Sequence, residues 1–180
     1  MGNFSDFAQH MDWAGLIDLL LSVAAILLCL TVHETCHGLA ACALGDPTAK
    51  RLHRLSLNPL RHIDPFGALM MLVAGFGWAK PVPVDPRYFR KPKLGMAITA
   101  LAGPVSNLVM AYLALLLRAV LLAFYHPGSV LLEGIIGFCE TLAVLNVGLG
   151  IFNLIPFPPL DGSKVLGAFL PDRAYYQDRK

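Results

Sequence analysis

Charged residues are scarce in this chain of 180 residues, since only 14% are Asp, Glu, Lys or Arg and 56% are hydrophobic. A soluble domain is typically about 25% charged and about 45–50% apolar, so this composition is too apolar for a soluble protein of this size. It also excludes intrinsic disorder, which requires low hydrophobicity and high net charge. The formal net charge of +2 argues against nucleic acid as a partner, because nucleic-acid-binding domains are strongly basic. We expect one membrane-embedded domain over residues 1–180.

Cysteine is also rare, and no two of the four cysteines form a CxxC pair. Most of them lie inside long apolar runs, where a cysteine behaves as a small hydrophobic side chain. The pattern predicts neither a disulfide framework nor a thiolate zinc site. These residues are Cys29, Cys36, Cys42 and Cys139.

Three apolar segments are long enough to span a bilayer, which requires roughly 20 residues. They cover about residues 13–44, 94–125 and 130–157. The fold class that they predict is an α-helical multi-pass membrane protein with three core transmembrane helices.

A fourth apolar stretch, residues 66–79, is too short to span, at 14 residues. Its length and its glycines predict a re-entrant or interfacial membrane segment. Its edge is suited to binding an unwound substrate strand, and we expect Gly75 and Gly77 to contact substrate there. A purely structural hydrophobic plug is the alternative.

The distribution of basic residues predicts the orientation. None occurs before Lys50, and thirteen of the fourteen lie on one side of the membrane if residues 66–79 do not cross it. The positive-inside rule assigns that side to the cytoplasm, so we expect the N-terminus outside, the C-terminus inside, and a location in the plasma or inner membrane. The exception, Arg118, is close enough to the outer end of its helix to extend to the interface. The first residues have no basic n-region, so we expect no cleaved signal peptide.

The first span contains the motif His33-Glu34-Thr35-Cys36-His37. Residues four apart project from one face of an α-helix, so both imidazoles can bind one zinc ion. Glu34 is next to the first ligand, and its carboxylate can take a proton from a zinc-activated water. A chance match is the other interpretation, but ionisable groups inside a span are costly and are functional by default. We expect one Zn²⁺ per chain. The four other histidines (His10, His53, His62 and His126) are expected to be solvated or structural.

A catalytic zinc ion needs a third protein ligand and one open position. The acidic residues in or beside the third span are Glu133, Glu140 and Asp161. Soluble enzymes with this motif often use a helical Glu, which favours Glu140. Topology favours Asp161 instead, because the first and third spans both run inward and Asp161 lies at the depth of the two histidines. We therefore expect Asp161 to be the third ligand.

Three prolines lie just before Asp161, in the segment NLIPFPPLDG from Asn153 to Gly162. Because proline breaks a helix, we expect the third span to unwind before Asp161. Irregular backbone at membrane depth is tolerated where it is buried or lines a wet cavity. The break therefore directs Asp161 and Asn153 towards a functional site. The alternative is a simple helix end at the membrane interface, which would explain the prolines and the glycine but not an asparagine eight residues before Asp161.

The chain resembles the compact bacterial branch of the site-2 proteases. The resemblance rests on these two motifs and on three segments between them: SLNPLRHIDPFG (56–67), GWAKPVPVDPRYF (77–89) and AGPVSN (102–107). Site-2 proteases are zinc intramembrane metalloproteases that cut transmembrane substrates in regulated intramembrane proteolysis. The resemblance implies that His33, His37 and Asp161 hold zinc and that Glu34 is the general base. It also implies that Asn153 stabilises the oxyanion and that Asn107 either packs helices or contacts substrate. The resemblance further implies that the re-entrant segment of residues 66–79 is β-like.

The chain departs from the family in two respects. It has no room for the PDZ or CBS domains of larger relatives, and it ends soon after the Asp-Gly motif, where compact relatives continue into another helix. A shortened chain and a minimal core are both compatible with this.

Two alternative functions are also compatible with the sequence. One is a membrane metal carrier or sensor, in which Glu34 would have no catalytic role. The other is a catalytically silent relative that binds membrane proteins. The expected partners are a transmembrane protein substrate and the lipid bilayer.

Overall fold

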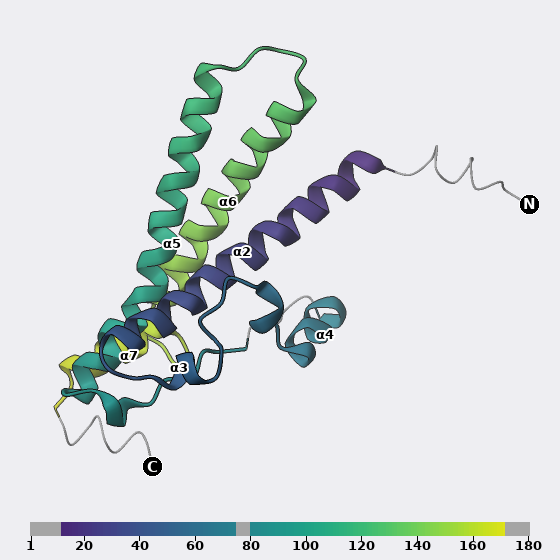
Figure 1. Cartoon of the computed structure of the whole chain (residues 1–180). Helices are drawn as coiled ribbons and strands as arrows, with labels where there is room; N and C mark the ends of the chain where they lie inside the picture. Colours follow the sequence, from purple (N-terminus) through teal and green to yellow (C-terminus); the bar gives the residue numbers. More distant parts are fainter. Residues whose placement is uncertain (1–11, 75–79, 172–180) are drawn as a thin grey trace, which may run out of the picture.

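The computed structural model describes residues 12–74 and 80–171, and three long helices dominate it (Figure 1). They are α2 (Trp13–Ala43), α5 (Pro92–Ala123) and α6 (Val130–Leu154). Each is long and apolar enough to cross a membrane. The three predicted spans are therefore confirmed, with helix ends within three residues of the expected positions.

The ends of these helices follow local sequence signals. At the start of α2, the carboxylate of Asp12 accepts a hydrogen bond from the backbone N–H of Gly15 at 2.9 Å and so caps the helix. Helix α5 begins at Pro92, where the missing N–H of proline costs nothing. Helix α6 ends at Leu154, just before Pro156. The third span therefore stops short of Asp161, as the prolines predict.

Helices α5 and α6 form an antiparallel pair, and α2 packs against both near one end and diverges from them at the other (Figure 1). Mostly small side chains line this junction, which lets the helices approach closely without a large apolar core. Many large apolar side chains instead face outward, as expected for helices in lipid. The buried cluster consists of Ala25, Cys29, Ala111, Ala114, Leu142 and Ala143.

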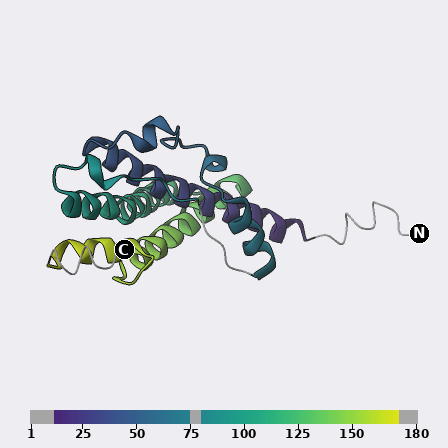
Figure 2. The ribbon, with the colours of Figure 1, turned by 90° about the horizontal axis from the view of Figure 1, so that it is seen from below.

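Most of the short elements lie where α2 ends and α5 begins, whereas the short helix of residues 65–74 lies away from there (Figure 1). Seen from below, α5 lies between the yellow helix α7 (Asp161–Phe169) and the part of the chain that carries α3 (Thr48–Arg51) (Figure 2). Helix α7 packs on both α5 and α6. The 3₁₀ turns η1 (Pro59–Arg61) and η2 (Pro86–Tyr88) shape the connections between α2 and α5.

The side chains of Asp46 and Arg54 hold the non-helical segment 80–85 beside α2. Asp46, which is completely buried, accepts hydrogen bonds from the backbone N–H of Thr48 at 2.9 Å and of Asp85 at 2.7 Å. The guanidinium of Arg54 donates to the carbonyl of Lys80 at 2.8 Å. The N–H of Lys80 also donates to the carbonyl of His62 at 2.8 Å, and these contacts together fix the segment, since residues 12–74 and 80–171 contain no strand that could pair with it.

The predicted re-entrant stretch is helical where the structure describes it, as α4 (Pro65–Ala74). Residues 75–79, with Gly75 and Gly77, lie outside the described residues. The β-like character expected for residues 66–79 is therefore wrong for residues 66–74, and its remaining part lies outside the described residues. The role of the two glycines stays a prediction, as does the single domain over residues 1–180.

Candidate metal centre

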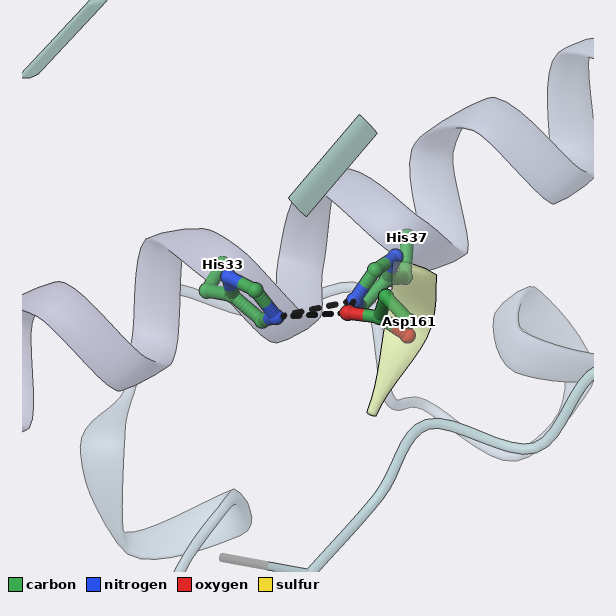
Figure 3. A group of neighbouring side chains, drawn as sticks. All are labelled: His33, His37 and Asp161. Carbon is green, nitrogen blue, oxygen red and sulfur yellow. Dashed lines mark hydrogen bonds and ion pairs between the residues drawn. The ribbon is translucent and has the colours of Figure 1, made fainter. Parts of the chain in front are cut away.

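The side chains of His33, His37 and Asp161, from the first and last described helices, lie close together (Figure 3). His33 and His37 project from α2, and Asp161 is the first residue of α7. The Nε2 atoms of the two histidines are 3.0 Å apart, and Oδ2 of Asp161 lies 3.1 Å from Nε2 of His33 and 3.0 Å from Nε2 of His37. Ligands bound tetrahedrally to one zinc ion are separated by about 3.4 Å, from bonds of about 2.1 Å. The triangle is thus close to the size that a zinc ion requires.

The second ring nitrogen of each histidine fixes the tautomer. Nδ1 of His33 lies 3.1 Å from Oδ1 of Asn107, and Nδ1 of His37 lies 2.7 Å from the carbonyl oxygen of Thr99. Because both oxygens can only accept, each Nδ1 carries the hydrogen and each Nε2 presents a lone pair. Two lone pairs and a carboxylate oxygen directed at one point repel one another unless a cation lies between them. The donor set therefore fits a metal ion such as zinc, with the orienting contacts that metal-bound histidines usually have.

Burial and charge keep Asp161 suited to bind a cation. All three side chains of the triangle are buried, and the other carboxylate oxygen, Oδ1, accepts a hydrogen bond from Nζ of Lys164 at 2.9 Å. Burial raises the pKa of Asp161, but its close polar contacts with the imidazoles of His33 and His37 and the nearby charge of Lys164 hold the pKa well below its ordinary value. Asp161 is therefore ionised at neutral pH.

The close approach of α5 to the histidines requires a glycine. A Cβ atom on Gly103 would lie 2.5 Å from Cε1 of His37 and 2.7 Å from Cε1 of His33. Since real Cβ atoms do not come this close to other heavy atoms, any side chain at this position displaces the imidazoles. Gly103 therefore allows α5 to bring Thr99 and Asn107 within reach of the two rings.

Glu34 borders the same cavity but is not part of the triangle. Its Oε2 atom accepts a hydrogen bond from the backbone N–H of Val82 at 2.9 Å, so the segment 80–85 fixes the carboxylate. The cavity has a volume of about 310 Å³, and Asn153 and Lys164 also line it. It is large enough for water and a short stretch of peptide, and polar side chains from α2, α5, α6 and α7 line it.

The structure separates the three acidic residues considered as the third ligand. Only Asp161 lies beside the histidines; Glu140 forms an ion pair with Arg118 at 2.9 Å, and Glu133 accepts a hydrogen bond from the hydroxyl of Tyr125. Arg118 therefore has a carboxylate partner on α6, where the sequence suggested only extension to the interface. The pairing neutralises two charges at membrane depth, which is costly for either charge alone.

The other predicted site residues have simpler surroundings. Asn153 uses one Nδ2 hydrogen on the carbonyl of Leu149, one helical turn earlier at 3.0 Å, and borders the cavity. Asn107 is fully buried. His62 is also buried, and its Nε2 lies 2.7 Å from the carbonyl of Ser56, a structural contact.

Sequence reasoning missed several groups that shape the site. The carbonyl of Thr99 and the N–H of Val82 are backbone atoms, which any residue type supplies, so no sequence signal identifies them. Lys164 had a signal, because it follows Asp161 by three residues and such residues are neighbours on a helix. Gly103 lies in a motif that resembles the family, but its role depends on how closely the helices approach.

Comparison with known proteins shows which protein family the sequence matches. The model of peptidase family M50 matches residues 21–178. "Putative zinc metalloprotease YwhC" of Bacillus subtilis is 42% identical over 150 residues, which cover 83% of this chain and 68% of that protein. "Putative zinc metalloprotease Rip2" of Mycolicibacterium smegmatis is 29% identical, over 88% of this chain and 60% of that protein, and Rip2 of Mycobacterium tuberculosis is 31% identical with the same coverage. The chain thus spans about 60–68% of the length of these relatives.

No solved structure matches the chain significantly. The family is nevertheless shown by the match over most of the sequence, which includes both metal-binding motifs of the predicted site. On this evidence, the chain is a multi-pass membrane protein that belongs to peptidase family M50.

Proposed function

We propose that this protein is a zinc-dependent intramembrane endopeptidase that hydrolyses peptide bonds of transmembrane protein substrates. The observation that supports this best is the buried triangle of His33, His37 and Asp161 with Glu34 on the same cavity. His33 lies ten residues before the end of α2, which corresponds to about 15 Å along the helix. Hydrolysis at this depth would take place within the span rather than in the adjoining loops.

His33, His37 and Asp161 would hold one zinc ion and leave a fourth position open towards the cavity. A zinc ion bound there supplies Lewis-acid chemistry, which polarises a carbonyl group and makes water acidic enough to lose a proton near neutral pH. The roles of this chain's own residues then follow from their contacts.

Glu34 would act as the general base. Its Oε2 atom is held by the N–H of Val82, so the carboxylate stays at the edge of the cavity and need not bind the metal. It takes the proton of the attacking water as oxygen adds to the scissile carbonyl carbon. It then returns that proton to the amide nitrogen, the C–N bond breaks, and a carboxylate and an amine are released.

Asn153 would stabilise the negative charge that develops on the carbonyl oxygen. One of its two Nδ2 hydrogens is used on Leu149 within α6, so the other remains for an oxyanion. Donors arranged before the reaction are worth about 10²–10³ in rate in other enzymes. Asn107 would instead act through His33, whose ring it orients.

A substrate helix must unwind before its peptide bonds can react, and the segment 80–85 is suited to bind the unwound chain. It borders the cavity through Pro81, Val82 and Val84, and it has no strand partner within the described part of the chain. The N–H groups of Lys80, Val82 and Asp85 already donate within the protein, so an added substrate strand would pair with the backbone groups that stay free among the described residues, which include the N–H of Val84. We propose further that the cavity faces the cytoplasmic half of the membrane, with the N-terminus outside, from the distribution of basic residues.

The test is co-expression with a tagged single-span substrate, comparing the wild type with Glu34→Gln. We expect cleavage to be lost while about one zinc ion per chain is retained, because Glu34 is not a ligand. Glu133→Gln is the matched control, since Glu133 makes its contact with Tyr125 away from the cavity. Unchanged cleavage by Glu34→Gln would refute the mechanism, and loss of zinc in that variant would place Glu34 among the ligands.

A further inference from the structure

Two grooves lie on either side of a ridge formed by Leu94 and Ile98 of α5. The first, of about 500 Å³, separates this ridge from the end of α2 and includes Ala43 and Phe89 in its lining. The second, of about 410 Å³, separates the ridge from α7 and includes Ala168. Both grooves are lined by Leu94, Ile98 and Lys91, so they converge at Lys91.

The ridge is part of the lipid-facing surface. Leu94 and Ile98 are four residues apart on one face of a helix that is long enough to span the membrane. They are 50% and 41% exposed, respectively. Lys91 precedes the first residue of α5, so the common mouth lies at the membrane–water interface and the grooves extend from it towards the hydrocarbon.

Two basic residues at the mouth, Arg90 and Lys91, have no ion-pair partner in the described part of the chain. Arg90 and Lys91 are exposed, and within residues 12–74 and 80–171 neither forms an ion pair or a side-chain hydrogen bond. Two other arginines do form ion pairs, Arg87 with Asp85 at 2.7 Å and Arg118 with Glu140. Two unpaired cations beside apolar grooves favour an amphipathic anion as the ligand.

From these grooves and charges we infer a binding site for an anionic diacyl phospholipid, with its phosphate between Arg90 and Lys91 and one acyl chain in each groove. Two separate apolar channels that meet at one cationic mouth match a ligand with two chains and one head. A protein helix would need a single continuous groove. None of the residues that line the cavity of Glu34 lines either groove, so the lipid site is distinct from the metal centre.

Binding of such a lipid would bridge three helices. The first groove lies between α2 and α5 and the second between α5 and α7, which provides Asp161. A lipid that occupies both grooves therefore holds α7 against the two spans. This inference rests on the membrane-spanning helices and does not depend on the proposed protease activity.

The experiment is native mass spectrometry of the full chain in detergent, titrated with phosphatidylglycerol or with phosphatidylethanolamine of the same acyl chains. Each basic side chain near an anionic lipid is worth about fivefold in affinity, so we expect phosphatidylglycerol to bind about 25-fold more tightly. The double variant Arg90→Gln/Lys91→Gln should abolish that preference. The control Lys50→Gln/Lys80→Gln removes the same charge from exposed positions outside the grooves and should keep the preference.

A second pair of variants tests the grooves themselves. Ala43→Trp fills the first groove and Ala168→Trp the second, and each should weaken phosphatidylglycerol binding while leaving the binding of a single-chain lysophosphatidylglycerol less affected. Equal binding of the two headgroups, or an equal loss in the Lys50/Lys80 control, would overturn the site in favour of diffuse attraction. Cross-linking of a photoreactive residue at Ile98 to another protein chain, instead of to lipid, would assign the grooves to a protein partner and also overturn it.

Discussion

The carboxylate of Glu34 and the backbone N–H of Val82 are joined by a 2.9 Å hydrogen bond, although the two residues are 48 positions apart in the sequence. The bond connects the helix that carries both histidines to the segment proposed to bind substrate. A strand bound at this segment would therefore lie next to the proton acceptor. The same contact leaves only one carboxylate oxygen of Glu34 free to receive a proton.

Val82→Pro removes the N–H donor, and we expect hydrolysis to fall about tenfold to hundredfold, because a general base that is misplaced by a fraction of an ångström loses much of its effect. Zinc content should not change. Val82→Ala keeps the N–H and is the matched control, with a smaller effect that reflects packing alone. Equal rates for the two variants would show that the hydrogen bond does not orient Glu34.

Gly103→Ala is expected to disturb the metal centre directly, because its Cβ would lie 2.5 Å from the ring of His37. Overpacking of this kind typically costs about 1–3 kcal/mol of stability. We expect reduced zinc content and a lower unfolding temperature in detergent. Gly148→Ala on α6 is the control, since nothing lies within 4 Å of its added Cβ. Full zinc occupancy in Gly103→Ala would contradict the close approach of α5.

Asn107→Leu removes the acceptor that holds Nδ1 of His33, and loss of such an orienting partner typically weakens metal binding about 10–100-fold. Competition with a chromophoric chelator measures this affinity. Asn107→Asp keeps an oxygen acceptor at the same position and should restore most of the affinity. If both variants bind zinc as the wild type does, Asn107 serves only helix packing.

Asp161→Ala should empty the zinc site, whereas Glu140→Ala should leave it filled. Metal analysis of the purified variants separates the two carboxylates considered from the sequence. Glu140→Ala should instead destabilise the α5–α6 pair, because Arg118 loses its partner at membrane depth. Loss of zinc in Glu140→Ala alone would mean that the helical glutamate is the ligand and that the depth argument is wrong.

Much of this architecture could be predicted because it depends on properties that sequence displays directly. Long apolar runs predict spans, and the spacing of His33 and His37 places both imidazoles on one helix face. The depth argument for Asp161 needed only the direction of two spans. The partner of Arg118 could not be predicted, because it depends on the rotation of α5 relative to α6. The contact between the carbonyl of Thr99 and His37 could not be predicted either, because it depends on how closely Gly103 lets α5 approach α2.

The contact between His33 and Asp161 joins residues 128 positions apart, in the first and the last described helices. Ribosomes make proteins from the N-terminus, so both histidines are synthesised and inserted well before Asp161 exists. During this interval a metal ion could be held by two ligands at most, and weakly. Full assembly of the centre therefore has to wait until α7 has been translated and docked. If the proposed function is correct, the site for hydrolysis would likewise be complete only after α7 has docked.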